Sequence, residues 1–451
     1  MKRAITRSWL TGFSILLLGT SAVVESDDRA RDPGVRGGIA GAGDPLPNLT
    51  QYELDFFQVG LEDFEEAEGI ADGLGPRFNL DSCGGCHLHP EIGGTSPALN
   101  PQVALATAFG ASNTVPSFIR PDGPVREARF KFNSNGSRDG GVHGLFVISG
   151  RVDGTGDATG CTIVQDEFEA QLARKNVIFR IPTPLFGSGL MESIPDTTLL
   201  ANLSSNSGAK SRAGISGRLN RNGNDGTITR FGWKAQVVSL LLFSGEAYNV
   251  EMGITSELFQ NERDQTAMCQ YTSHPNDVTA LDATSGLPVV SAIENFAVFM
   301  RLLAPPTASL TTPGGSTSIT RGRQLFADIG CALCHTPTMK TGNATVAALQ
   351  YKDANLFSDL ALHSMGPRLA DNVEQGLAAG DEFRTAPLWG LGQRLFFLHD
   401  GRTRDLVRAI QEHASTGNSQ FAASEANRVI GNFASLPGRS QQDLLNFLRS
   451  L

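Results

Sequence analysis

Two five-residue stretches, Cys83-Gly84-Gly85-Cys86-His87 and Cys331-Ala332-Leu333-Cys334-His335, decide how this chain of 451 residues folds. Each reads C-x-x-C-H, the pattern at which a c-type haem is attached. Two intervening residues let both thiols reach vinyl groups on one edge of the porphyrin, and the histidine that follows then lies under the iron. The motifs therefore predict two covalently bound c-type haems. We expect Cys83, Cys86, Cys331 and Cys334 to hold them, with His87 and His335 as iron ligands.

Other chemistries of paired cysteines fit these motifs less well. A structural zinc site needs two cysteine pairs close together or a nearby pair of histidines, whereas here the pairs are far apart and each carries its own histidine. A thioredoxin-like redox site needs a strand–helix–strand context, whereas loops rich in proline and glycine follow the motifs. We therefore interpret both motifs as haem sites.

The first 26 residues are typical of a secretory signal peptide. Lys2, Arg3 and Arg7 precede an apolar run, and small residues follow that run. The run is too short and too interrupted to favour a permanent membrane span. Export agrees with the motifs, because c-type haem is attached outside the cytoplasm in bacteria. We therefore expect a periplasmic or otherwise exported protein.

Length and composition indicate two or three domains. The net charge is −9 and no basic patch stands out, so a nucleic-acid partner is not expected. A stretch rich in Thr, Ser, Gly and Pro separates an N-terminal haem domain with insertions, 27–306, from a C-terminal cytochrome c-like haem domain, 319–451. Cys161 and Cys269 lie outside the motifs, and whether they form a disulfide is open.

The apolar pattern predicts a mainly α fold with loop-rich insertions and a few short strands. Helical spacing recurs over 50–74, 230–248, 292–303, 320–329 and 441–451, and 126–150 alternates in places as strands do. A faint repeat follows the motifs, since Pro184-Leu185-Phe186-Gly187 resembles Pro387-Leu388-Trp389-Gly390. The simplest account is a duplicated haem domain. His399 and His413 follow the second copy, whereas nothing after the first copy mirrors them.

Several segments outside the motifs resemble a known family. The run Phe383–His399, the turn His399-Asp400-Gly401-Arg402 and the paired motifs resemble bacterial di-haem cytochrome c peroxidases. More closely, Asp139–His143, Arg230–Ala235 and Phe357–Leu360 are similar to segments of the di-haem oxidoreductase (putative peroxidase) family. That family is related to bacterial di-haem cytochrome c peroxidases and to the methylamine-utilisation di-haem enzyme. The resemblance covers nearly all of the chain after the signal peptide. It implies one six-coordinate electron-transfer haem and a second haem that reacts with hydrogen peroxide after a ligand leaves.

The resemblance also implies a second ligand for the iron at His335. In the peroxidases the distal methionine lies fourteen residues beyond the histidine of the equivalent turn, and here that position is His413. We expect His413 to be this ligand, with Met365 and His363 as alternatives. A His/His pair favours ferric iron more than a His/Met pair does, so we expect a lower reduction potential than in the His/Met peroxidases.

The first haem is expected to be open, or easily opened, opposite His87. Splitting the O–O bond of peroxide needs a group that moves a proton between the two oxygens. Glu192, shortly after the first repeat copy, is the candidate catalytic residue, although the peroxidase pattern places its glutamate later. A surface position at a helix end is an equally good interpretation of Glu192. His143 and His89 are candidate sixth ligands in a closed resting state.

Two further features complete the expectations. Trp233 and Trp389 are candidates to carry electrons between the haems, and packing in the core is the plainer interpretation of both. By resemblance alone, a Ca²⁺ ion lies between the domains. Asn224-Asp225-Gly226 offers oxygen ligands for it without an EF-hand pattern.

The sequence therefore predicts an exported di-haem c-type cytochrome that reduces hydrogen peroxide. The expected electron source is a small donor protein, a cytochrome c or a cupredoxin. Two alternatives stay open at this point: a non-catalytic di-haem electron-transfer protein, and a di-haem oxidase that modifies a protein substrate.

Overall fold

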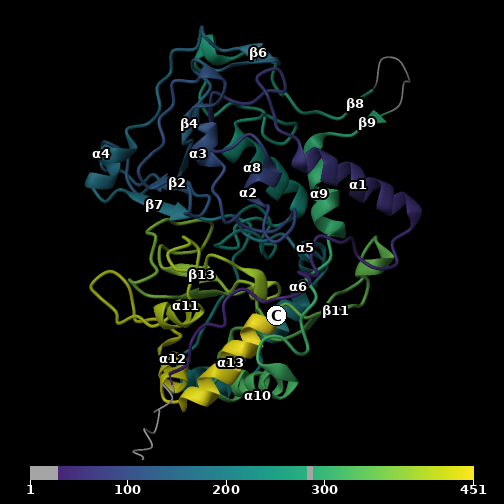
Figure 1. Ribbon diagram of the computed structural model, residues 1–451, viewed down its shortest axis with the longest axis vertical. Helices are drawn as coiled ribbons and strands as arrows, with labels where there is room; N and C mark the ends of the chain where they lie inside the picture. Colours follow the sequence, from purple (N-terminus) through teal and green to yellow (C-terminus); the bar gives the residue numbers. More distant parts are fainter. Residues whose placement is uncertain (1–28, 282–287) are drawn as a thin grey trace, which may run out of the picture.

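The computed structural model describes residues 29–281 and 288–451, and helices are its main regular structure (Figure 1). The predicted mainly α fold is confirmed. The α-helices are α1 (Gln51–Glu65), α2 (Cys83–Cys86), α3 (Gln102–Leu105), α4 (Phe168–Ala173), α5 (Ser188–Glu192), α6 (Asp196–Ser204), α7 (Ser207–Ala213), α8 (Leu240–Met252), α9 (Ala292–Leu302), α10 (Gly315–Asp328), α11 (Leu406–Glu412), α12 (Asn427–Ala434) and α13 (Gly438–Ser450). Short 3₁₀ turns are η1 (Ala108–Gly110), η2 (Ala267–Cys269), η3 (Cys331–Leu333), η4 (Ala347–Leu349) and η5 (Leu391–Gln393).

The strands are short and pair antiparallel. They are β1 (Arg77–Phe78), β2 (Glu127–Phe130), β3 (Val142–His143), β4 (Phe146–Val147), β5 (Val152–Asp153), β6 (Gly156–Asp157), β7 (Val177–Arg180), β8 (Ala280–Leu281), β9 (Pro288–Val289), β10 (Met339–Lys340), β11 (Asp353–Ala354), β12 (Leu362–Ser364) and β13 (Glu382–Arg384). One sheet has three strands in the order β3-β2-β7, and the others are pairs. As expected, strands occur within 126–150.

Helices α1, α8 and α9 build the core beside the first motif (Figure 1). A capping box starts α1: the Thr50 hydroxyl accepts from the Glu53 N–H, and the Glu53 carboxylate accepts from the Thr50 N–H. A Cβ at Gly60 would lie 2.5 Å from the carbonyl oxygen of Asn295, so this glycine lets α1 approach α9 closely. Phe64, at the end of α1, is buried in this core.

Helices α10 and α13 enclose the core beside the second motif (Figure 1). A Cβ at Gly322 would lie 2.0 Å from the carbonyl oxygen of Asp443, which shows how closely the two helices pack. Phe326 of α10 packs on Phe357 and Phe447, with ring centroids 5.9 and 5.5 Å apart. A helix that precedes each motif thus packs an aromatic side chain against the motif histidine: Phe64 of α1 against His87, and Phe326 of α10 against His335.

The N-terminal and C-terminal parts of the chain are interleaved. The Asp32 carboxylate accepts from the Arg449 guanidinium at 2.7 Å through each oxygen, so the start of the described chain lies along α13. The stretch 339–361 contributes apolar side chains to the N-terminal core, although it follows the second motif. The domain boundaries 27–306 and 319–451 stay a prediction, and the predicted signal peptide, 1–26, lies outside the described residues.

The helix expected over 230–248 begins only at Leu240, so that prediction was wrong at its start. Ser239 caps the helix by accepting from the Leu242 N–H, and the preceding residues form a loop in which Gly232 has a φ of 80°. The helix ends at Gly253, which adopts the left-handed conformation that glycine allows. The loop and helix α8 together form one wall of the first cavity described below.

A disulfide joins Cys161 to Cys269, which answers the question that the sequence left open. The two cysteines are 108 positions apart, so the bond closes a long loop of the N-terminal part. In the part of the chain that the structure describes, no helix combines the length and the apolar character that crossing a bilayer requires.

Candidate functional site

The first motif forms the short helix α2. The Ser82 hydroxyl caps it by accepting from the Gly85 N–H. His87 follows directly, and its Nδ1 lies 2.9 Å from the carbonyl oxygen of Gly94. That bond places the proton on Nδ1 and leaves Nε2 as the free donor atom. Burial lowers the pKa of His87 to about 4, so the imidazole is neutral at pH 7, which is the form that binds metal.

The second motif repeats this arrangement in the turn η3. The Nδ1 of His335 lies 2.9 Å from the carbonyl oxygen of Phe357. Burial lowers the pKa of His335 to about 4, against the effect of that bond. His335 is therefore also a neutral imidazole with a free Nε2. Neither carbonyl partner lies within the motif itself, so the motif alone does not reveal these bonds.

His413 lies directly after α11, at the residue that ends this helix. The Asp405 carboxylate caps that helix by accepting from the Arg408 N–H. The Nδ1 of His413 lies 2.8 Å from the carbonyl oxygen of Ala409, one turn earlier. Burial lowers the pKa of His413, so it too is neutral. A hydrogen bond between Nδ1 and a backbone carbonyl oxygen thus orients His413 in the same way as the two motif histidines.

His335 and His413 line one apolar cavity of about 220 Å³. The two imidazoles are close enough for His413 to depress the pKa of His335 further. Side chains from α10, α11, α12 and α13 form part of the wall, including Phe326, Leu406 and Leu444. The cavity therefore offers a free nitrogen from each of two histidines inside an apolar shell.

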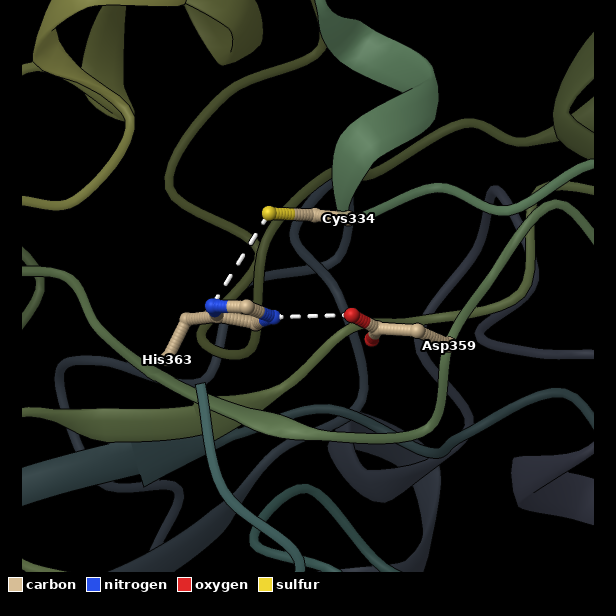
Figure 2. A group of neighbouring side chains, drawn as sticks. All are labelled: Cys334, Asp359 and His363. Atoms are coloured by element: carbon tan, nitrogen blue, oxygen red, sulfur yellow. Dashed lines mark hydrogen bonds and ion pairs between the residues drawn. The ribbon is translucent and has the colours of Figure 1, made fainter. Parts of the chain in front are cut away.

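The alternative ligands of this cavity differ in their surroundings. Figure 2 shows His363 beside Cys334 and Asp359, and its Nε2 lies 3.0 Å from an Asp359 oxygen. Its Nδ1 lies 2.7 Å from an oxygen of Glu425. Burial opposes a charge on His363, but Asp359 outweighs it and raises the pKa well above its usual range. Both nitrogens of this imidazolium are occupied. Met365 lines the cavity without such partners and stays an alternative.

The two candidate sixth ligands of the first haem lie elsewhere. His143 is held between two carboxylates, with Nε2 2.9 Å from Asp139 and Nδ1 2.8 Å from Asp166. The Nε2 of His89 lies 2.7 Å from the carbonyl oxygen of Gln393. Neither histidine is among the residues that line the cavity beside His87.

That first cavity, of about 140 Å³, differs from the second in its lining. Among the described residues around it, His87 is the only histidine, and no methionine, tyrosine or lysine contributes. Gln236 and Glu246 line it from the loop before α8 and from α8 itself. The Gln236 Oε1 and the Glu246 Oε2 are buried without a hydrogen-bond partner. These two atoms are available to a ligand that enters the cavity.

The sequence does not predict either residue as part of the site. Its apolar spacing predicts one helix over 230–248, and no glutamate stands where the peroxidase pattern places one. A signal was present, because Glu246 is a lone acidic residue inside the run Leu240–Val250, which is otherwise apolar or neutral. A buried charge in such a helix needs a partner or a function.

Further carboxylates surround Glu246. Burial raises the pKa of Glu246, and the nearby Glu127 charge adds to the shift. Burial also raises the pKa of Glu251 well above its usual range. The Glu251 carboxyl accepts from the Asn79 amide at 2.6 Å, and the Arg129 guanidinium donates to Glu127 at 2.7 Å. The cavity thus combines buried carboxyl groups with an arginine that pairs with one of them.

Glu192 lines neither cavity. Its Oε1 accepts from the Leu240 N–H at 2.8 Å, and its Oε2 accepts from the Arg301 guanidinium at 2.7 Å. Both oxygens therefore support the first turn of α8 and its contact with α9. The catalytic role of Glu192 stays an untested prediction, and this position does not support it.

Trp233 lines both cavities, whereas Trp389 lines neither of them. The Trp233 indole N–H donates to the carbonyl oxygen of Ile181 at 2.9 Å, which fixes the ring between the two sites. Asn224 and Asp225, the residues considered for Ca²⁺, lie in an exposed turn. The Asp225 carboxylate accepts from the Thr227 N–H there, and Ca²⁺ binding stays a prediction.

The residues present fit a haem in each cavity. Cys86 and His87 line the first cavity, and Cys331, Cys334 and His335 line the second. The second is largely apolar, and the first has unpaired buried polar atoms that a bound oxidant could engage. The arrangement can therefore hold one haem with two protein ligands and one haem with an open face.

Comparisons with known proteins give the family. Residues 133–451 match the family described as "Di-haem oxidoreductase, putative peroxidase". Similar solved structures include the diheme peroxidase BthA from Burkholderia thailandensis E264, at 14% identity over 94% of each chain with a TM-score of 0.40. A MauG-like protein associated with microbial copper homeostasis matches at 15% identity over 57% of this chain and 89% of that chain, with a TM-score of 0.29.

A third similar structure is Kuenenia stuttgartiensis hydrazine synthase, at 18% identity over 36% of this chain with a TM-score of 0.23. The match spans 55% of the length of that chain. No curated protein matches the chain. Because the family match covers most of its length, the protein belongs to the di-haem oxidoreductase, putative peroxidase family, and it is a di-haem peroxidase-type oxidoreductase.

Proposed function

We propose that this protein is an exported c-type peroxidase that reduces hydrogen peroxide in the first cavity and receives electrons through the second. The haems are attached at the cysteines of the two motifs. The observation that carries the proposal is the difference between the cavities. The second presents two neutral imidazoles, His335 and His413, whereas the first presents His87 alone, facing Gln236 and Glu246. Two protein ligands suit electron transfer, and one leaves a position for peroxide.

The bound haems supply iron that takes up and releases electrons. The side chains of the first cavity supply the proton movements. The Glu246 carboxylate takes a proton from one peroxide oxygen and delivers it to the other, which leaves as water. The Gln236 side chain hydrogen-bonds the peroxide and orients it for this transfer. With two electrons and two further protons, one molecule of hydrogen peroxide yields two molecules of water.

The second cavity and Trp233 form the proposed route for electrons. A small exported donor, a cytochrome c or a cupredoxin, would deliver electrons at the second site, where His335 and His413 would hold the haem. Trp233 lines both cavities, so its indole connects the two haem sites. An aromatic ring at this position couples an electron donor and an electron acceptor better than solvent or aliphatic side chains do. The donor surface and the export step are parts of the proposal.

The Glu246→Gln substitution tests the catalytic assignment. It keeps the size and hydrogen-bonding capacity of the side chain but removes its ability to take up a proton. We expect peroxide turnover to fall by about 10²- to 10⁴-fold, the usual contribution of general acid–base catalysis, with haem content unchanged. Steady-state peroxide consumption with a reduced donor measures this.

Glu192→Gln is the matched control, because it changes a nearby glutamate that lines neither cavity. We expect its turnover to stay within a few-fold of wild type, on the scale of about 1 kcal/mol or less. If peroxide turnover instead fell strongly in Glu192→Gln and little in Glu246→Gln, Glu192 would be the residue that moves the proton. Unchanged turnover in Glu246→Gln would remove Glu246 from the mechanism.

A further inference from the structure

A buried tyrosine–glutamate pair lies close to the first motif and has no part in the mechanism above. The Tyr248 hydroxyl, on α8, donates to the Glu68 carboxylate at 2.6 Å. Tyr248 is 4% exposed and Glu68 is 7% exposed, so the bond is shielded from water. Burial raises the pKa of Glu68 to about 7. A carboxylate that is able to take up a proton near neutral pH therefore faces the phenol.

A chain of aromatic contacts links this pair to His87. The ring of Phe64 lies 5.9 Å from the imidazole of His87, Phe296 lies 5.9 Å from Phe64, and Tyr248 lies 5.2 Å from Phe296, all between ring centroids. These side chains come from α1, α9 and α8, which pack side by side (Figure 1). The proximal side of the first site is therefore continuous with the phenol through aromatic rings.

A second contact places Tyr248 beside the same site. Met252 lies one helical turn after Tyr248, and its sulfur is 4.0 Å from the sulfur of Cys83. Cys83 is one of the two attachment residues of the first motif. Tyr248 thus lies on the same helix as the methionine that contacts this attachment sulfur.

The chemistry of phenols gives this arrangement a use. A tyrosine is oxidised readily when its proton leaves together with the electron, and a hydrogen-bonded carboxylate is a suitable acceptor for that proton. Phenylalanine rings are not oxidised themselves, but they couple the donor and the acceptor of an electron. Among the four tyrosines of the chain, Tyr52 and Tyr351 are exposed, at 71% and 66%.

We propose that Tyr248 is a redox-active side chain of the first site, which holds one oxidising equivalent when the electron donor is scarce. After hydrogen peroxide has oxidised the site, Tyr248 gives up one electron along Phe296 and Phe64, and its phenolic proton moves to the Glu68 carboxylate. The products are a neutral tyrosyl radical and a protonated Glu68, and no bond between heavy atoms changes. The proposal rests on the proposed function, because peroxide is the oxidant.

The test is freeze-quench electron paramagnetic resonance on the ferric holoprotein, mixed with hydrogen peroxide in the absence of a donor. The haem absorption spectrum is followed in the same samples. We expect a tyrosyl signal that narrows when the protein contains ring-deuterated tyrosine. The Tyr248→Phe variant, which keeps the ring against Phe296, should lose at least about nine-tenths of it, a tenfold effect of about 1.4 kcal/mol. Glu68→Gln should weaken the signal without a change in the resting spectrum.

Two controls identify the residue. Tyr271→Phe changes another partly buried tyrosine and should leave the signal intact. A Tyr52→Phe, Tyr271→Phe, Tyr351→Phe triple variant retains Tyr248 as its only tyrosine and should still give the signal, which keeps the test valid if Tyr248→Phe does not mature. A haem that reacts with peroxide without a tyrosyl signal, or an equal signal in Tyr248→Phe, would overturn the proposal. A haem spectrum that peroxide leaves unchanged would overturn the proposed function and this inference together.

Discussion

At the scale of single residues, three histidines share one arrangement: Nδ1 lies within hydrogen-bond distance of a backbone carbonyl oxygen, and the side chain lines a cavity. His87, His335 and His413 have it, and burial keeps each of them neutral. His363 is the contrast, because two carboxylates hold it as an imidazolium. The choice of iron ligand therefore depends on the partner of each ring as much as on its position in the chain.

Replacement of His413 tests the ligand assignment. In His413→Ala the second haem should lose the second of its two protein ligands, so its low-spin bis-imidazole bands in the near infrared should be replaced by high-spin absorption. His413→Met should restore a low-spin spectrum with a higher reduction potential, because methionine favours ferrous iron. His363→Gln is the control and should leave the near-infrared bands in place. An unchanged spectrum in His413→Ala would contradict the assignment.

The pKa of Glu246 predicts a pH dependence. Glu246 acts in its carboxylate form, and burial raises its pKa, so the inactive acid form persists to a higher pH than in an exposed glutamate. Peroxide turnover should therefore fall as the pH drops through a value above about 4.3, the usual pKa of glutamate. A pH–rate profile of kcat/KM measures this. In Glu246→Gln the acidic limb should vanish, and a limb that persists there would assign it to another group.

The site could be predicted from the sequence only where the pattern is local. The C-x-x-C-H motifs state their chemistry in five residues, and His413 followed from the resemblance of the turn at His399. Glu246 was missed because its role depends on α8 lying across the cavity from His87, which no local pattern shows. Glu192 was chosen for its position after the repeat, but its oxygens are engaged by Leu240 and Arg301.

At the scale of elements, the start of α8 decides the shape of the first cavity. In an uninterrupted helix over 230–248, Gln236 and Glu246 would be separated along the helix axis by ten residues. The loop that ends at Ser239 instead lets both side chains line the same cavity. Apolar spacing predicted a helix here but not its first residue, because the loop 230–239 is also buried and apolar in places.

Close packing of α10 on α13 supports the second cavity, whose wall includes Phe326 and Leu444. Gly322→Ala puts a methyl group 2.0 Å from the Asp443 carbonyl oxygen, so the helices must separate. We expect a loss of about 1–3 kcal/mol in the free energy of unfolding, the usual cost of overpacking. Denaturant unfolding of the holoprotein measures the loss.

The matched control is Gly431→Ala, in the helix α12, where an added Cβ has no neighbour within 4 Å. It should stabilise the protein by about 0.5–1 kcal/mol, because alanine is the better helix former. Equal effects of the two substitutions, in either direction, would show that the contact between α10 and α13 is not tight.

At the scale of the whole molecule, the two haem sites are related by a repeat that the sequence already shows. Each repeat copy ends in a glycine with positive φ that precedes a short helix: Gly187, with φ 69°, before α5 and Gly390, with φ 74°, before η5. A strand precedes each copy, β7 in one case and β13 in the other. The duplication was visible from these turns, whereas the interleaving of residues 339–361 with the N-terminal core depends on contacts distant in sequence.

Trp233 connects the two sites, and its replacement tests the electron route. Trp233→Phe keeps an aromatic ring but shortens it and removes the bond to the Ile181 carbonyl oxygen. Electron transfer from the second haem to the first should be slower than in wild type. Rapid photoreduction followed by absorption at both haems measures the rate. Trp389→Phe is the control, and an equal effect of both substitutions would mean that Trp233 is only a packing residue.

The central claim is that the two cavities hold irons of different coordination. The most direct test is electron paramagnetic resonance of the ferric holoprotein before and after addition of cyanide. We predict one low-spin signal from a bis-imidazole haem and one high-spin signal, with cyanide converting only the high-spin centre. Two low-spin signals that cyanide leaves unchanged would contradict the claim and would indicate a pure electron carrier.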